Sequence, residues 1–178
     1  LNVNGGAILV SSGILSINDE LDVANGIITQ TGGEIHVKAN STVGWNGTSD
    51  NKFDMDAGTL TLSGGVLSVQ AQATSAFNCI DIEAGVIANI GTGHTISISQ
   101  TNSTFADDSY LRLNGNPIGN LTINLNGKTA FFRETPVIEG ALTVIYGILN
   151  FENFDATVNG STTVNGILKF GTGNYDFN

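Results

Sequence analysis

This chain of 178 residues has little of several residue types that mark whole classes of protein. Its one cysteine, Cys79, rules out an internal disulfide framework, and a lone cysteine is more often a buried apolar residue than a reactive thiol. Only 6 Lys and Arg accompany 16 Asp and Glu, so a phosphate backbone or an anionic lipid surface would be repelled. We therefore expect no nucleic-acid partner and no membrane insertion.

The sequence also lacks the short motifs of common enzymes. Nucleophile elbows, phosphate-binding loops and nucleotide fingerprints are missing. The two histidines, His36 and His94, have no further His or Cys at ligand spacing. We expect both histidines at the surface or at a corner of the fold, and we expect no cofactor.

A recurring unit fills the first half of the chain. LNVNGG from Leu1 returns as LDVANG from Leu21, FDMDAG from Phe53 and IDIEAG from Ile80. Apolar and polar residues alternate with period two, which predicts a strand with one buried face, and glycine closes the strand after about six residues. Further short apolar segments complete each copy. Each copy therefore predicts three short strands with tight corners.

Units that cannot bury an apolar face alone must stack on their neighbours, which predicts a solenoid. The expected fold class is all-β, a right-handed parallel β-helix of about seven three-strand coils with variable loops on one corner. The corner glycines are Gly6, Gly26, Gly58 and Gly85. Two inward files are expected, one of Leu1, Leu21, Phe53, Ile80 and Leu111 and one of Val3, Val23, Met55, Ile82 and Leu113. The alternative is a β-sandwich or a barrel of hairpins, which the recurrence of a whole three-strand unit disfavours.

The domain organisation follows from the spacing of the copies. We expect a single β-helix segment over 1–178, with longer coils and variable loops over 1–120 and tighter coils over 121–178. The first residues of the chain, from Leu1, already match the repeated unit, so we expect the chain to be cut from a longer precursor.

The tighter coils carry a resemblance to a known class of protein. LTI from Leu121, ALTV-x-x-GILNF from Ala141 and TVNGSTTVNGILKF from Thr157 resemble the β-solenoid repeats of large secreted cell-surface proteins and adhesins of the Bacteroidota. That class is associated with type IX secretion and gliding motility. The resemblance implies an extracellular, non-catalytic structural or adhesive module. Its expected partners are a surface polysaccharide or another cell-surface or secretion-machinery protein.

One candidate site lies on the outward face of the first strand. Asp22, Asp54 and Asp81 should occupy one column, and Asp56 and Glu83 the next, about 5 Å apart between coils. Carboxylates that close are either solvated, bridged by a cation such as Ca²⁺, or used in catalysis. The spacing would suit a retaining glycosidase, so a polysaccharide-active enzyme using this acidic pair is the alternative function. The motifs of pectin-degrading β-helix enzymes are present only as isolated dipeptides in the wrong order.

A second candidate site is a row of loop aromatics, Trp45, Phe77 and Phe105. These side chains could form a strip that packs against sugar rings, or a small hydrophobic cluster that holds the loops against the rod. Ice binding by a flat threonine array is a third possibility. It has weak support, since the local pair Thr59 and Thr61 is not repeated in neighbouring copies.

Overall fold

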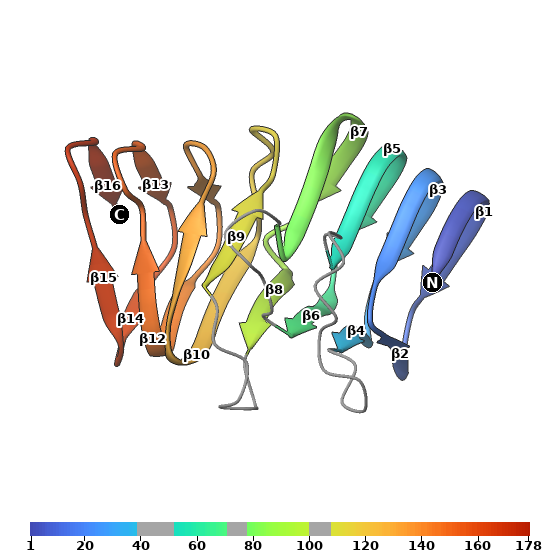
Figure 1. Ribbon diagram of the computed structural model, residues 1–178, viewed down its shortest axis with the longest axis horizontal. Helices are drawn as coiled ribbons and strands as arrows, with labels where there is room; N and C mark the ends of the chain where they lie inside the picture. The colour runs from blue at the N-terminus through green and yellow to red at the C-terminus, as the bar shows by residue number, and fades with distance from the viewer. Residues whose placement is uncertain (39–51, 71–77, 100–107) are drawn as a thin grey trace.

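The computed structural model describes residues 1–38, 52–70, 78–99 and 108–178, and these residues fold into a rod of stacked coils with the two termini at opposite ends (Figure 1). Within them there are sixteen β-strands and no helix. The strands of the first four coils are β1 (Asn2–Val10), β2 (Ile14–Asn18), β3 (Leu21–Gln30), β4 (Glu34–Lys38), β5 (Phe53–Leu62), β6 (Gly65–Gln70), β7 (Ile80–Ile90) and β8 (His94–Ser99). Those of the later coils are β9 (Ser109–Arg112), β10 (Asn120–Phe132), β11 (Val137–Ile138), β12 (Leu142–Asn150), β13 (Ala156–Val158), β14 (Thr162–Val164), β15 (Ile167–Lys169) and β16 (Tyr175–Phe177).

Every strand pair in the described residues is parallel, which confirms the β-helix. A thirteen-stranded sheet runs through all the coils, and β11, β13 and β16 form a separate three-stranded sheet. The third strands of successive coils are β2, β4, β6, β8, the start of β10, the start of β12, and β14. A sandwich of hairpins would need antiparallel ladders, so that alternative is excluded for these residues.

The first four coils differ from the expected plan in one respect. The first two strands of each copy are joined into one long strand, as in β3 and β5, rather than separated at a corner. Gly58 has a φ of 108°, so the chain bends there while the ladder continues from Gly26↔Gly58 to Gln30↔Leu62. A glycine that bends a strand therefore does not end it.

The later coils are tighter because β10 and β12 each belong to two coils. The first part of β10, Asn120 to Asn124, pairs with β8, and its last part, Ala130 to Phe132, pairs with β9. The third strand of one coil thus runs directly into the first strand of the next coil.

The core consists of apolar columns that run along the rod. Leu21, Phe53, Ile80 and Leu111 are in register and have no exposed surface, and Val23, Met55 and Ile82 form the adjacent column. Both predicted inward files are confirmed in these coils. Near the C-terminus the first file continues as stacked rings of Phe132, Phe151 and Phe170, with 5.8 Å between successive ring centroids.

A ladder of glycines forms the corner that precedes each third strand. Gly13, Gly33 and Gly65 have φ angles of 72°, 67° and 84°, a region that L side chains rarely adopt. A Cβ on Gly33 would lie 2.5 Å from the carbonyl oxygen of Gly13. In the next coil His94 takes this position, since it is paired with Gly65.

Candidate functional site

The acidic column on the outward face of the first strands is confirmed by the strand register. Asp22 pairs with Asp54, and Asp54 pairs with Asp81. The register adds one residue at each end, because Asn2 pairs with Asp22 and Arg112 pairs with Asp81. Three aspartates in successive coils are thus flanked by an amide and a guanidinium.

Arg112 binds the last aspartate of the column through two nitrogens. Its Nε donates to Asp81 Oδ1 and its Nη2 to Asp81 Oδ2 at 2.8 Å, while Nη2 also lies 2.7 Å from Glu83 Oε1. The hydrogen bond that Arg112 donates to Asp81, supported by the negative charges of Asp81 and Glu83, raises the pKa of Arg112 above its ordinary value despite partial burial. A bidentate arginine–carboxylate pair is among the stronger hydrogen-bonded contacts in proteins, so this contact fixes both side chains.

Asp81 is enclosed as well as paired. Its side chain is 2% exposed, and Asn78 Nδ2 donates a further hydrogen bond of 2.8 Å to Oδ2. At the other end of the column, Asn2 Nδ2 donates to Asp22 Oδ2 at 2.6 Å. The donors at both ends offset the repulsion that three neighbouring carboxylates would otherwise produce.

Asp56 and Glu83, the second predicted acidic column, are not paired one to one across the ladder. The ladder between β5 and β7 changes register after Met55↔Ile82 and resumes at Ala57↔Gly85. Asp56 therefore lies opposite two residues, Glu83 and Ala84, as at a β-bulge. Such a bulge re-aims side chains, and Glu83 contacts Arg112. Among the described residues, no group of three or more His, Cys, Asp or Glu side chains is arranged to hold a metal ion.

The predicted row of aromatics, Trp45, Phe77 and Phe105, lies outside the residues that the structure describes. A different aromatic pair borders the acidic column. The rings of Tyr110 and Phe131 are stacked with 5.1 Å between centroids and 13° between planes. The guanidinium carbon of Arg133 lies 3.8 Å from the centre of the Tyr110 ring.

Asn78 links the aromatic pair to the acidic column. Its amide nitrogen donates to Asp81, and its amide oxygen accepts a hydrogen bond of 3.4 Å from Arg133 Nε. The alternation that aligns Leu111 and Leu113 with the inward files also places Arg112 on the outward face, so the sequence contained a signal for this contact. The positions of Arg133 and Phe131 could not be predicted in this way, because the repeated sequence pattern changes before them.

Several polar side chains are buried that sequence reasoning did not expect to be buried, among them His94 and Lys52. His94 lies at a corner as expected, but it is fully buried rather than on the surface, because it occupies a position of the inward-packed glycine ladder. Burial lowers the pKa of His94 to about 4. Lys52 is 1% exposed at its side chain, and its Nζ lies 3.1 Å from Asp19 Oδ1.

Cys79 is fully buried, which confirms its expected role as an apolar core residue. Burial raises the pKa of its thiol to about 12, and Sγ lies 3.1 Å from the carbonyl oxygen of Tyr110. A thiol with such a pKa is a poor nucleophile at neutral pH.

Comparison with known proteins finds no matching family model, no matching curated protein and no matching solved structure. In the part of the chain that the structure describes, no helix has the length and apolar character needed to cross a membrane.

Proposed function

We propose that this chain is a non-catalytic structural and adhesive module of a secreted cell-surface protein. The observation that carries this proposal is the state of Asp81, the most enclosed carboxylate of the acidic column. Both of its oxygens accept hydrogen bonds from Arg112, one also accepts from Asn78, and its side chain is 2% exposed. Such a carboxylate stabilises neighbouring coils.

Polysaccharide hydrolysis makes different demands on a carboxylate pair. A retaining glycosidase needs one carboxyl group that carries a proton and a second that can reach the anomeric carbon. Both oxygens of Asp81 already accept hydrogen bonds, from Arg112 and from Asn78. The geometry therefore favours an ion pair over a catalytic dyad. The enzyme alternative rests on the direct pairing of Asp54 with Asp81.

The rod also has a suitable architecture for spacing a binding surface away from a cell. Each coil contacts its neighbours through continuous apolar columns, so length can be added coil by coil. A surface polysaccharide is the ligand class that we propose. The half-buried rings of Tyr110 and Phe131, with the amide of Asn78 nearby, are the kind of groups that contact sugar rings.

The test is a panel of plant, algal and bacterial glycans assayed in parallel for binding and for new reducing ends. We expect no turnover by the unaltered chain. Turnover that Asp54→Ala or Asp81→Ala abolishes would establish the enzyme and end the structural proposal.

For binding, the informative variant is Tyr110→Ala. Its matched control is Tyr146→Ala, which removes a 65% exposed tyrosine from a third strand. Loss of glycan binding in the first variant alone would assign the contact to the aromatic pair. Equal binding by both variants would place any glycan contact elsewhere.

A further inference from the structure

The fifth coil is shorter than the four before it between its first and third strands. Its first strand, β9, pairs with β7, and its third strand, at the start of β10, pairs with β8. Between these two pairings the fourth coil has thirteen residues, 82–94, whereas the fifth has only seven, 113–119. A tight turn at Asn114 and Gly115, with φ angles of 53° and 71°, closes the shorter path. The rod therefore has a step between its fourth and fifth coils.

Because of this step, one edge of β7 is open along the second half of the strand. On the side of the third coil, β7 pairs with β5 from Ile80 to Ile90. On the side of the fifth coil, it pairs with β9 only at Ile80 and Asp81, and within the described residues no strand pairs with 86–90 on that side. In Figure 1, β7 is the last in the row of strands β1, β3, β5 and β7. An open strand edge thus lies in the middle of the rod, with further coils before and after it.

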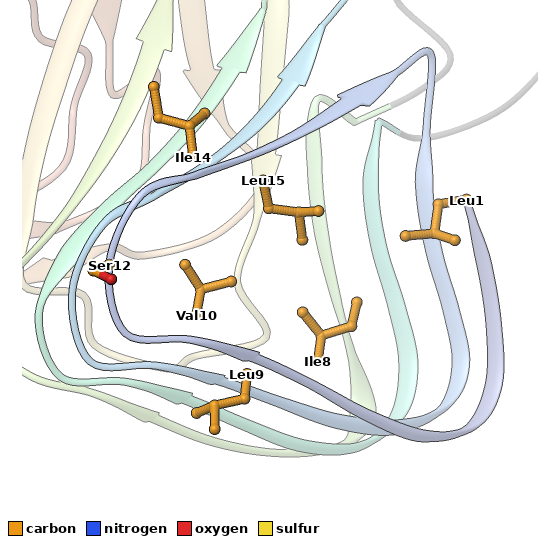
Figure 2. A pocket seen from close by; sticks show the side chains of 7 residues that line it. All are labelled: Leu1, Ile8, Leu9, Val10, Ser12, Ile14 and Leu15. Carbon is orange, nitrogen blue, oxygen red and sulfur yellow. The ribbon is translucent and has the colours of Figure 1, made fainter.

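The alternation of side chains defines which residues of this edge face inward. Figure 2 shows the pattern in the first coil, where Ile8 and Val10 point into the coil and Leu9 points away from it. The strand register carries this pattern through β3 and β5 to β7. Ala88 is therefore an inward residue of the fourth coil, and Ile87, which is 67% exposed, is an outward one.

The inward side chains at the open edge are incompletely covered. Ile28 and Leu60 belong to the same column as Ala88 in the second and third coils, and neither has any exposed surface. Ala88 itself is partly exposed, as is Ile90, although both pack against the core. An apolar column of the core thus ends at the step without a cover from the fifth coil.

The backbone of this edge also directs hydrogen-bonding groups toward the step. The amide of Gly91 donates to the carbonyl oxygen of Leu62, so it points toward the third coil. Because the hydrogen-bonding direction alternates along a strand, the amides of Ala88 and Ile90 point toward the fifth coil. A second peptide backbone is the natural complement of such a row of donors and acceptors.

The sequence of this edge does nothing to discourage pairing. Exposed edge strands commonly carry a charge or a proline that prevents another strand from adding to them. Residues 84–91 read AGVIANIG and contain neither. The bulge opposite Asp56 lies before this segment, and the register from Gly85 to Ile90 is unbroken. The edge is therefore suited to accept a strand.

We propose that the open edge of β7 binds an extended segment of a partner protein. The segment runs parallel to β7 over residues 86–90, where the second strand of a full-length fifth coil would lie. Its inward side chains are apolar, because they cover Ala88 and Ile90. The segment is not acidic, since this chain has a net charge of −10. Polysaccharides and nucleic acids lack a backbone of alternating amide donors and carbonyl acceptors, so a peptide is the occupant that this edge selects.

A peptide copied from this chain is the probe. The sequence AGTLTLSG, residues 57–64, contains the part of β5 that pairs with β7 on its other edge. Fluorescence anisotropy of the labelled peptide, titrated with the full chain up to about 1 mM, covers the range of weak interfaces. We expect saturable binding of one peptide per chain. The absence of saturable binding in this range would overturn the proposal.

N-methylation of alternate peptide amides tests the backbone contact. In β5 the amide of Ser63 points toward the preceding coil, so those of Thr59 and Thr61 do so as well, and those of Leu60 and Leu62 point away. In the complex the preceding strand is β7. Methylation at the two threonines should weaken binding about 10-fold or more, and methylation at the two leucines should change it little. Equal effects of the two peptides would overturn the added strand.

Variants of the chain test the same contact from the other side. Ala88→Pro removes an amide that points to the open side and leaves the ladder with β5 intact, so it should weaken binding about 10-fold or more. Ala88→Lys places a charge on the edge and serves as a second variant if proline disturbs the strand. Its matched control is Asn89→Lys, which adds the same charge to the neighbouring outward residue. Unchanged binding by both Ala88 variants, or an equal loss in Asn89→Lys, would overturn the proposal.

Amide hydrogen exchange locates the contact directly. In the free chain the amide of Ala88 should exchange faster than that of Leu60, which lies within the ladder, and the peptide should slow the exchange of Ala88. Protection of Ala88 without peptide would overturn the proposal. If light scattering then shows a dimer that Ala88→Pro abolishes, the edge belongs to a contact with a second copy of the chain.

Discussion

Nε2 of His94 lies 3.0 Å from Oε1 of Gln30, although a whole coil separates the strands that carry them. Gly65 belongs to the intervening coil, and a Cβ there would lie 2.9 Å from Gln30 Nε2. The amide nitrogen of Gln30 donates to the carbonyl oxygens of Gly33 and Val66, which fixes Oε1 as the acceptor. His94 therefore donates from Nε2, and its Nδ1 has no hydrogen-bond partner among the described residues.

This contact predicts acid sensitivity. The pKa of His94 is about 4 in the folded chain because burial disfavours the imidazolium, against about 6.5 when unfolded. The unfolded state then binds the proton more tightly than the folded state. The stability that the neutral His94 contributes is therefore fully present above pH ~6.5 and is lost as the pH falls toward ~4. The loss from this group is about 3 kcal/mol at most.

Denaturant unfolding between pH 7 and pH 4 measures the effect. Carboxylates titrate near the lower end of this range, so the informative quantity is the difference from His94→Gln, which should lose stability less steeply. His36→Gln is the control, because His36 is partly exposed and lies beside Glu34 on the surface. Equal pH profiles for the parent and His94→Gln would contradict the prediction.

Because Arg112 and Asp81 form an ion pair, we expect the effects of substituting the two residues on the free energy of unfolding to be non-additive. Arg112→Gln leaves Asp81 in an enclosed site beside other carboxylates and should lower the free energy of unfolding by about 1 to 3 kcal/mol, since the arginine itself is partly exposed. Adding Asp81→Asn should recover part of that loss. Urea melts of the four members of this double-mutant cycle give the coupling energy, and additive losses would mean that the pair contributes nothing specific.

The glycine ladder predicts a position-dependent effect of one methyl group. Gly33→Ala combines a positive φ with a Cβ only 2.5 Å from a backbone oxygen, whereas Gly127→Ala combines a similar φ of 72° with open space. The second change should cost about 1 kcal/mol and the first several kcal/mol. Thermal melting compares them directly. Similar losses would show that the corner can move apart without penalty.

Trp45 is the only tryptophan, which makes the loop aromatics accessible to fluorescence. We expect a blue-shifted emission maximum and little quenching by iodide, as for a cluster that holds the loops against the rod. Trp45→Ala should then cost about 3 to 5 kcal/mol of stability. Red-shifted, readily quenched emission would favour the sugar-binding strip instead. In that case the substitution should weaken glycan binding by about 1 to 3 kcal/mol with little change in melting temperature.

The core and the acidic column could be predicted because both repeat at fixed positions of each copy. Alternation sets which side chains point inward, and stacking then places Asp22, Asp54 and Asp81 in one column. The position of Asp56 could not be predicted in the same way. One extra residue in β7 forms the bulge, and the local alternation on either side of it is unchanged.

The burial of His94 depends on residues from other coils, which is why it could not be predicted from the repeat pattern. The imidazole replaces a glycine of the ladder and meets a side chain 64 positions earlier in the chain. Both Gly65 and Gln30 are needed for that contact. Gly65 is the equivalent of His94 in the preceding coil, but Gln30 lies two coils before His94.

The continuity of β10 bears on how the rod comes apart. Where a loop joins two coils, the outer coil can peel away while the inner one keeps its ladder. No loop separates the two coils between Asn120 and Phe132. This segment is the single strand β10, which is hydrogen-bonded to β8 at its start and to β9 at its end. β12 is continuous in the same way, since its start pairs with β14 and its end with β15. Under a pulling force on the C-terminus, the coils joined by β10 and β12 should therefore detach in a single large step, whereas each earlier coil gives a smaller one.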